Sequence, residues 1–224
     1  MNRIITFLFL TAVFMSGYSC RSKNKLLNKA EILHPRDSGY LFDGNSLKGW
    51  EITNFGPQGD VYVSGDKIIL GMGDGCTGVT WKEEFPTADY EITLEAMRVD
   101  GNDFFCGMTF PVGKDPCSLI VGGWGGTVVG LSSINGMDAS ENETMVIRQF
   151  DKNRWYRIRL KVTGETIKAW IDDEVVIDFT IGDNYLSIRP EVELSKPFGI
   201  ASWRTTAAIR NIRLVPLLGG VGGG

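Results

Sequence analysis

The chain has 224 residues, a formal net charge of −4 and acidic and basic side chains that are well mixed along it. Proteins that bind nucleic acid carry a basic face or stripe, so this charge balance argues against a nucleic-acid partner. The only histidine is His34. Serine–histidine triads, cysteine–histidine pairs and multi-histidine zinc sites would all depend on that residue. We therefore expect any base chemistry to come from carboxylates, with a lysine or a tyrosine as the alternative.

The N-terminal stretch "MNRIITFLFLTAVFMSGYSC" has the layout of an export signal. Arg3 precedes an apolar run from Ile4 to Met15 that is too short to span a bilayer. The small-residue exit "GYSC" resembles the lipobox of bacterial lipoproteins, in which the cysteine is acylated and becomes the mature N-terminus. We therefore predict a signal peptide over residues 1–19 and lipid attachment at Cys20, which would hold an exported lipoprotein on the periplasmic face or the cell surface. The alternative is a secreted protein in which Cys20 is incidental.

The rest of the chain is predicted to form one domain between two irregular ends. Residues 20–37 are polar, contain a proline and show no sustained period, as in a tether, and residues 218–224 form a glycine-rich tail. Residues 38–217 have a length typical of a single all-β domain. We expect the cysteines of this domain to be buried structural thiols, with one disulfide left open as an alternative: Cys76, Cys106 and Cys117.

Apolar and polar residues alternate with a period of two through much of this domain. The pattern is clearest over Tyr90–Val99 and Trp155–Val162, and it continues to Ile181 through a tight turn at residues 172–174, which predicts a three-strand meander. No window predicts a long amphipathic helix. Short strands are predicted at residues 61–63, 67–70, 78–82, 104–110, 119–121, 128–131, 144–148, 198–203 and 208–215. The prediction is an all-β, two-sheet β-sandwich of jelly-roll or concanavalin-like (laminin G-like) topology, with a lipocalin-like barrel as the second choice.

A glycine-rich segment, "VGGWGGTVVGLSSINGMDASENET", surrounds Trp124 and runs into a cluster of carboxylates and amides. It is no phosphate cradle, because Thr127–Leu131 has the pattern of a strand rather than of a helix start. In one interpretation the small glycines leave a concave surface on the sheet, with the indole of Trp124 exposed above it. A sugar ring would then pack against the indole, and the polar loop 135–143 would bind its hydroxyls. In the other, Trp124 fills the core and the glycines permit bends or bulges.

Three stretches in order along the chain resemble one known family. They are "YLFDGNSLKGWEI" from Tyr40, "RWYRIRLKVTGETIKAWIDDEVVID" from Arg154, and "AIRNIRLVPL" from Ala208. Together they are similar to the 3-keto-disaccharide hydrolases, formerly a domain family of unknown function with a concanavalin-like β-sandwich that is common among secreted bacterial lipoproteins. The similarity covers Ser38–Leu217. Asp43, Trp50, Arg210 and Asn211 within these motifs have adequate structural roles in a turn, at a sheet edge or on backbone groups.

The resemblance implies a reaction, but a histidine that relatives often carry is absent from the matching position of this chain. A ketone at C3 of a sugar acidifies the C2 proton, and removing that proton lets the glycosidic oxygen leave C1, which needs a base and a stabilised oxyanion. Relatives often carry a glutamine and a histidine shortly before Arg-Asn-Ile, where this chain has "ASWR". The candidate bases are therefore the carboxylates Asp103, Asp138, Glu141 and Glu143. The candidate ligand-binding residues are Trp124, Asn142, Trp203 and Arg204, with Arg204 or an unidentified cation at the enolate. The sequence leaves open whether a divalent cation such as calcium binds among the loop acids.

Three functions are compatible with these residues. The first is an envelope enzyme, a hydrolase or lyase acting on glycosidic bonds of (3-keto-)saccharides. The second is a non-catalytic carbohydrate-binding module on the same lipid anchor, and a scaffold that contacts other envelope proteins is a third. The expected partners are a saccharide ligand and a membrane reached only through the N-terminal lipid.

Overall fold

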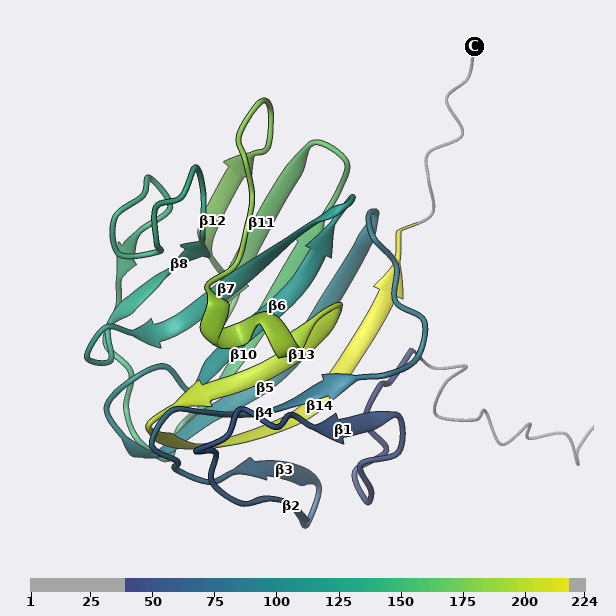
Figure 1. Ribbon diagram of the computed structural model, residues 1–224, viewed down its shortest axis with the longest axis vertical. Helices are drawn as coiled ribbons and strands as arrows, with labels where there is room; N and C mark the ends of the chain where they lie inside the picture. The colour runs from purple at the N-terminus through teal and green to yellow at the C-terminus, as the bar shows by residue number, and fades with distance from the viewer. Residues whose placement is uncertain (1–38, 218–224) are drawn as a thin grey trace, which may run out of the picture. The chain divides into compact units, whose positions relative to one another are not determined.

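The computed structural model describes residues 39–217, which form two seven-stranded sheets packed face to face (Figure 1). The front sheet has the order β1-β4-β13-β6-β7-β8-β9, and the back sheet has the order β12-β11-β10-β5-β14-β3-β2. Neighbouring strands are antiparallel throughout. Residues 1–38 and 218–224, with the predicted signal peptide, Cys20, tether and tail, lie outside the described residues.

The strands of the front sheet are β1 (Trp50–Ile52), β4 (Cys76–Trp81), β6 (Cys106–Val112), β7 (Asp115–Gly123), β8 (Val128–Ser132), β9 (Val146–Ile147) and β13 (Phe198–Trp203). Those of the back sheet are β2 (Val61–Ser64), β3 (Lys67–Leu70), β5 (Tyr90–Gly101), β10 (Trp155–Val162), β11 (Thr166–Ile171), β12 (Glu174–Thr180) and β14 (Thr205–Pro216). A 3-10 helix, η2 (Pro190–Ser195), lies between β12 and β13 in the sequence. Residues 39–217 contain no helix with the length and hydropathy that a membrane-spanning segment needs.

The predicted sandwich is confirmed, and the lipocalin-like barrel is wrong because each sheet keeps two free edge strands instead of closing on itself. In the back sheet, buried and exposed residues alternate along β5, β10 and β11, as the period of two predicted. The predicted hairpin turn between β11 and β12 is present. Asp172 and Asp173 have φ values of 51° and 69° there, the left-handed conformation that a two-residue hairpin with right-handed strand twist requires.

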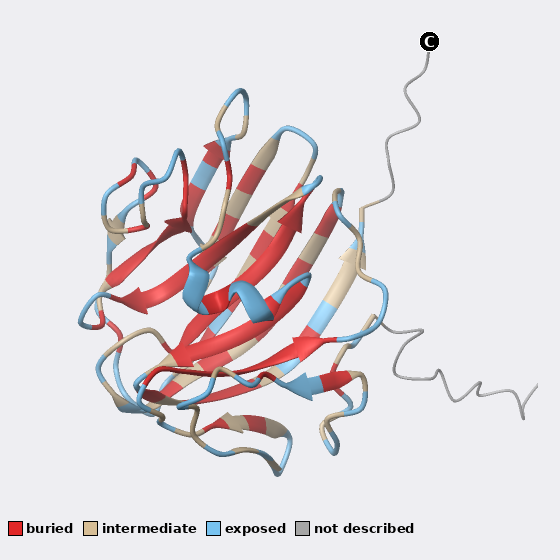
Figure 2. Ribbon diagram, in the orientation of Figure 1, coloured by how far each residue is buried: buried red, intermediate tan, exposed pale blue. Residues whose placement is uncertain are grey.

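The front sheet differs from the back sheet because the long strands at its centre are buried on both faces (Figure 2). Its inner face is core, and its outer face is covered by other parts of the chain. A Cβ on Gly199 would lie 2.7 Å from the carbonyl oxygen of Ser195 in η2, and a Cβ on Gly107 would lie 2.8 Å from the ring of Phe104. Small residues on the outer face thus let η2 and an aromatic loop pack directly on the sheet.

The tryptophan of the first family-like motif closes one side of the core. Trp50 is 7% exposed, and its ring lies 5.2 Å from that of Trp81 and 5.8 Å from that of Phe198. Its Nε1 donates a hydrogen bond of 2.8 Å to the carbonyl of Leu41. Asp43 accepts hydrogen bonds from the backbone of its own turn. Both residues therefore have the structural roles that the sequence predicted.

Arg210 and Asn211 lie on the outer face of the back sheet, at an irregularity of β14. Arg210 Nε and Asn211 Nδ2 both donate to Glu95 Oε2, over 2.6 and 2.8 Å. The guanidinium of Arg210 also stacks on Trp155, 4.1 Å from the ring centroid. The prediction that these side chains satisfy backbone groups is wrong, because their partner is a carboxylate on a neighbouring strand.

Candidate functional site

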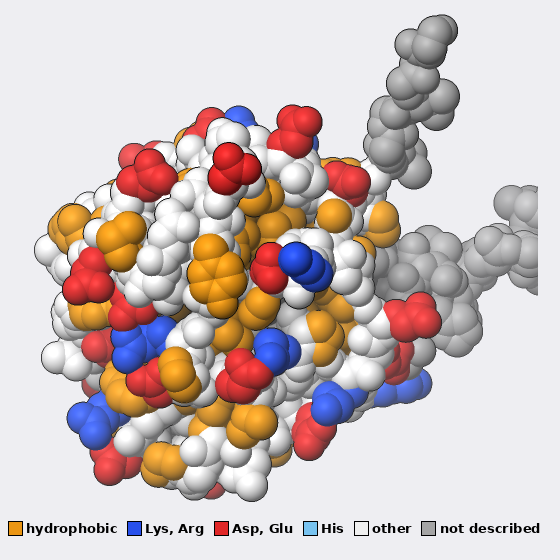
Figure 3. All heavy atoms as spheres, turned by 45° about the horizontal axis from the view of Figure 1, so that its top comes forward, with side chains coloured by type: hydrophobic (Ala, Val, Ile, Leu, Met, Phe, Trp, Pro, Cys, Tyr) orange, Lys and Arg blue, Asp and Glu red, His pale blue; other side chains and the backbone are white. Residues whose placement is uncertain are grey.

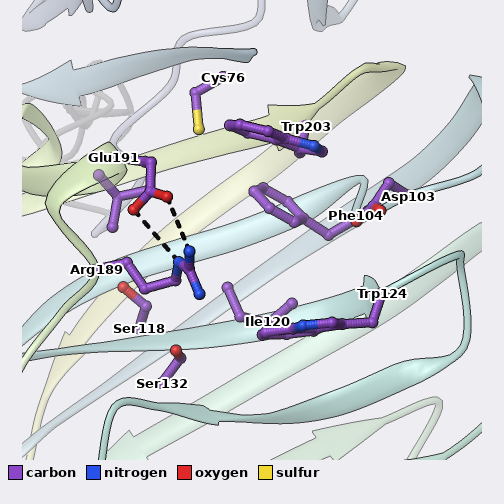
Figure 4. A pocket seen from close by; sticks show the side chains of 11 residues that line it. Cys76, Asp103, Phe104, Ser118, Ile120, Trp124, Ser132, Arg189, Glu191 and Trp203 are labelled. Carbon is purple, nitrogen blue, oxygen red and sulfur yellow. Dashed lines mark hydrogen bonds and ion pairs between the residues drawn. The ribbon is translucent and has the colours of Figure 1, made fainter. Parts of the chain in front are cut away.

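A pocket of about 220 Å³ lies on the outer face of the front sheet (Figure 4). It is floored by β4, β7 and β8, and its walls come from the β5–β6 loop, the β7–β8 loop, the end of β13 and the segment that contains η2. Figure 3 shows hydrophobic, acidic and basic side chains interspersed on the visible surface, without a large area of one charge. The lining residues are Cys76, Asp103, Phe104, Ser118, Ile120, Trp124, Ser132, Arg189, Glu191, Val192 and Trp203.

Three aromatic side chains form one side of the pocket, and we call Phe104, Trp124 and Trp203 the aromatic rim. Figure 4 shows Phe104 between the two indoles. The backbone N–H of Trp203 donates to the carbonyl of Phe104 over 3.0 Å, which fixes these two residues together. Trp124 has a φ of 48° and is 41% exposed. The interpretation in which Trp124 fills the core is therefore wrong, and its indole faces the pocket and solvent.

Asp103 lines the pocket and also joins the two loops of the rim. Its Oδ1 accepts a hydrogen bond of 2.7 Å from the backbone N–H of Phe104. Its Oδ2 accepts one of 3.2 Å from the backbone N–H of Gly125, the residue after Trp124. Both oxygens of this predicted base therefore accept hydrogen bonds from the backbone of the two loops that carry the aromatic rim.

The polar end of the pocket is a carboxylate–guanidinium cluster formed by Asp138, Arg189 and Glu191. Arg189 binds the carboxylate of Glu191 with two nitrogens, over 2.8 and 3.3 Å, and also donates to Asp138. Asp138 accepts further hydrogen bonds from the hydroxyls of Ser132 and Ser133, over 3.2 and 3.1 Å. Figure 4 shows Arg189 and Glu191 on the side of the pocket away from Trp124.

The ion pair shifts the titration of both partners. The hydrogen bond from Arg189 lowers the pKa of Glu191 below its ordinary value of 4.5, although partial burial opposes the shift. The same hydrogen bond raises the pKa of Arg189. Near neutral pH the pocket therefore contains an ionised Glu191 that a bidentate ion pair with Arg189 holds in one position.

We expect the contribution of Glu191 to the stability of the fold to depend on pH. A carboxylate whose pKa is depressed in the folded state stabilises the protein above its unfolded pKa, and the effect is lost as pH falls through the folded pKa. Glu191→Gln should lower Tm near neutral pH by no more than about 4 °C, because the pair is well exposed. Thermal unfolding followed by circular dichroism should show this difference shrinking below pH 4.5, the ordinary pKa of the group. A difference independent of pH would contradict the assignment.

The cysteines of the domain are buried and unpaired, as the prediction of structural thiols required. The disulfide alternative is not formed among these three residues. The pKa of each thiol is raised to about 12, chiefly by burial, and for Cys76 in the pocket the nearby charge of Glu191 contributes to the rise. A nucleophilic role for Cys76 is not supported, since the thiolate is the reactive form.

The buried thiols should resist alkylation. We expect iodoacetamide at about pH 8 to leave Cys76, Cys106 and Cys117 unmodified in the native protein, and to modify all three in guanidinium chloride. Peptide mass spectrometry resolves the sites individually. Rapid native labelling of Cys76 would show that the pocket admits the reagent to an ionised thiol.

Not all of the predicted site residues come together. Asp103, Trp124 and Trp203 line the pocket, and Asp138 lies beside it through Arg189. The side chain of Asn142 is buried, and its Nδ2 donates to backbone carbonyls of its own loop and to that of Leu131, over 2.7 Å. Glu141 and Glu143 are exposed and outside the set of lining residues, and Arg204 extends to Asp74 over 2.8 Å rather than into the pocket.

Sequence reasoning missed the segment that supplies the polar end of the pocket. Arg189 and Glu191 follow β12 in a stretch without strand periodicity, and only the tertiary fold brings that stretch onto the front sheet. The strand predicted over residues 104–110 begins only at Cys106, so Phe104 lies in the loop before β6. Within residues 39–217 no three His, Cys, Asp or Glu side chains gather in an arrangement that would hold a metal ion, so the divalent cation that the sequence left open among the loop acids has no such set of ligands there.

Comparisons with known proteins agree with the fold. No curated protein matches this chain. The carbohydrate-binding module CBM66 of Bacillus subtilis superposes with a TM-score of 0.52 at 19% identity, over 78% of this chain and 98% of the module. A Crh5 transglycosylase in complex with NAG gives 0.53 at 16% identity, over 79% and 82%. A Bacillus subtilis protein of unknown function with a galectin-like fold gives 0.54 at 11% identity, over 76% and 90%.

At these identities the superpositions establish the sandwich fold, and the sequence establishes the family. The family model described as a 3-keto-alpha-glucoside-1,2-lyase-like domain matches residues 37–215, nearly the whole of the part that the structure describes. This range contains both the aromatic rim and the carboxylate–guanidinium cluster. The chain therefore belongs to the family of 3-keto-alpha-glucoside-1,2-lyase-like domains.

Proposed function

We propose that the pocket on the front sheet binds a saccharide, one ring of which lies against the aromatic rim. The observation that carries this proposal is the pairing of that rim with hydrogen-bonding groups across a single small cavity. The C–H faces of a sugar pack against aromatic rings, while its hydroxyls need charged or polar partners. The carboxylate–guanidinium cluster and the hydroxyls of Ser118 and Ser132 supply such partners.

The size of the cavity supports a small ligand unit. Its volume of about 220 Å³ is below the roughly 300–1,000 Å³ typical of sites for drug-sized molecules. The similarity in fold to a carbohydrate-binding module and to a transglycosylase crystallised with NAG also supports a carbohydrate-related role. The lining carries one guanidinium and two carboxylates, Asp103 and Glu191, which favours a neutral saccharide over an acidic one.

Cleavage of a 3-keto-glycoside is the second candidate function, and it is favoured by the ion pair inside the pocket and by the family of the chain. Glu191 would take the proton from C2, and the electrons of the C–H bond would form an enolate whose oxygen at C3 lies near Arg189. Collapse of the enolate would form the C1=C2 bond and break the C1–O bond, and the leaving oxygen would take up the proton that Glu191 then carries. Glu191 is ionised at neutral pH and can accept a proton, but its lowered pKa makes it a weaker base, so the step relies on the acidity that the C3 ketone gives the C2 proton.

The two candidates are tested together by incubating the protein with neutral disaccharides and their 3-keto forms. Binding is followed by tryptophan fluorescence, because two indoles line the pocket, and cleavage by released monosaccharide, with and without a chelator. Saturable binding without release supports a carbohydrate-binding module. Release of monosaccharide from the keto forms alone supports the lyase. The absence of both binding and release would contradict both candidate functions.

We also propose that the chain works outside the cytoplasm, held to a membrane by a lipid on Cys20. The support is the sequence alone, in which an apolar run ends at a lipobox-like "GYSC". Wild-type protein should partition with membranes and incorporate labelled palmitate, and Cys20→Ser should do neither. Incorporation of the label by the Cys20→Ser variant would contradict the proposal.

A further inference from the structure

A buried arginine of the back sheet contacts the loops that carry the aromatic rim. Arg98 lies near the end of β5, and its side chain points into the sandwich, where the residue is only 5% exposed. Burying a guanidinium is costly unless its donors are met. Here its charge lies 5.1 Å from the ring centroid of Phe105, and burial lowers its pKa. A residue in such a place requires a compensating set of contacts.

The contacts of Arg98 are backbone carbonyls of the pocket loops. Its Nη2 donates to the carbonyl of Asp103 over 3.2 Å, to that of Gly122 over 3.2 Å and to that of Gly126 over 2.9 Å. Its Nη1 donates to the carbonyl of Phe150 over 3.3 Å. Asp103 precedes Phe104, and the two glycines lie on either side of Trp124. One guanidinium on the core side of the pocket is therefore hydrogen-bonded to both loops that carry the aromatic rim.

The glycines beside Trp124 make room for this guanidinium. Gly122 has a φ of 76°, and a Cβ at this position would lie 2.5 Å from Arg98 Nη2. Gly126 has a φ of 108°, and a Cβ there would lie 3.3 Å from the same atom. The glycine-rich sequence around Trp124 thus follows from the approach of a buried arginine as well as from the turn itself.

We infer that Arg98 is a positioning residue of the pocket, which sets the place of Trp124 and Phe104 without touching the ligand. The inference rests on the proposed function for its effect on saccharide binding, but its effect on the loops can be measured without a ligand. Four carbonyl contacts from one rigid planar group define the loop geometry more closely than a single-point donor would.

The test compares Arg98→Met with Arg148→Met in the full chain, purified in a mild detergent. Arg148 is a matched control, since its guanidinium lies 5.9 Å from the ring of Phe150 but bonds to Ile171 and Glu174, away from the pocket. Arg98→Met should speed hydrogen exchange over residues 122–127 at least about tenfold while the core strands stay protected. It should weaken binding of a neutral disaccharide at least about tenfold. Arg148→Met should do neither.

A second pair of variants tests the same contact from the other side. Gly122→Ala introduces both a strained φ and the collision with Arg98, whereas Gly136→Ala has a similar φ of 77° with nothing within 4 Å of the added carbon. Gly122→Ala should reproduce the exchange and binding defects of Arg98→Met, and Gly136→Ala should not. Arg98→Lys, which keeps the charge but loses the planar fork, should recover only part of the affinity.

The outcomes separate this inference from the proposed function. If the wild type binds no saccharide, the proposed function fails, and local exchange over residues 122–127 still decides the role of Arg98. Unchanged exchange and affinity in a folded Arg98→Met protein would overturn the inference. Exchange that accelerates equally across both sheets would also overturn it, because the residue would then act on the fold as a whole. Should Arg98→Met not fold, Arg98→Lys and Gly122→Ala give the same readouts.

Discussion

Replacing Trp124 with alanine is expected to weaken saccharide binding by at least tenfold, or about 1.4 kcal/mol. The indole lies at the open side of the pocket, 41% exposed in the free protein. A ring stacked on it would therefore bury apolar surface that is now in water. Because the indole is not part of the core, the substitution should leave Tm almost unchanged. Titration calorimetry with the tightest-binding disaccharide of the panel gives the affinity.

Trp155→Ala is the control for this experiment. Trp155 lies on the outer face of the back sheet beneath Arg210, so its removal tests the loss of a partly exposed tryptophan far from the pocket. Its affinity should match that of the wild type. Equal binding by Trp124→Ala and wild type would show that the rim is not the binding surface, even if saccharide binds elsewhere on the protein.

Glu191→Gln is expected to reduce cleavage of a 3-keto-glycoside by about 10²–10⁴-fold, the usual contribution of a general base. Glutamine keeps the size of the side chain and a hydrogen-bond acceptor for Arg189, but it does not accept a proton at neutral pH. Dissociation constants should therefore change only a few-fold while kcat falls. The measurement is single-turnover release of monosaccharide, with binding followed separately by tryptophan fluorescence.

Two further carboxylates serve as comparisons. Glu141→Gln alters an exposed acid outside the pocket lining and should leave turnover unchanged. Asp103→Asn changes a lining residue whose oxygens bind the backbone of Phe104 and Gly125, so it should weaken binding and cleavage together. Loss of cleavage in Asp103→Asn with full activity in Glu191→Gln would move the base to Asp103.

The alternation of apolar and polar residues was sufficient to predict most strands and the sandwich, because it reports directly which face of a strand is buried. The two indoles of the pocket were predicted from other features, Trp124 from the glycine-rich segment around it and Trp203 from the stretch before Arg-Asn-Ile. The polar end could not be predicted in the same way. Arg189 and Glu191 are 65 or more positions beyond Trp124 in the printed sequence, and no local pattern states on which sheet their segment packs.

The roles of polar residues in the loops were also hidden from the sequence. Asn142 and Asp138 are residue types common in sugar-binding loops. In the fold, however, the amide of Asn142 donates to backbone carbonyls, and Asp138 accepts from two serines and Arg189. A loop must satisfy its own buried polar groups before it can offer any to a ligand. The polar groups that stay available to a ligand depend on the hydrogen bonds of the folded loop, and the amino-acid composition does not determine them.

The placement of η2 has a consequence for how such a site changes during evolution. The charged groups Arg189 and Glu191 belong to one short stretch of chain, attached to the front sheet by contacts such as the hydrogen bond from Thr80 Oγ1 to the carbonyl of Leu194, 3.0 Å long. The indoles belong to other parts of the chain, the β7–β8 loop and the end of β13. Under the proposed function, the base and the aromatic rim would come from separate pieces of sequence. Exchange of the single surface segment that contains Glu191 would then be expected to convert a catalyst into a binding protein without changing the strands of the sandwich.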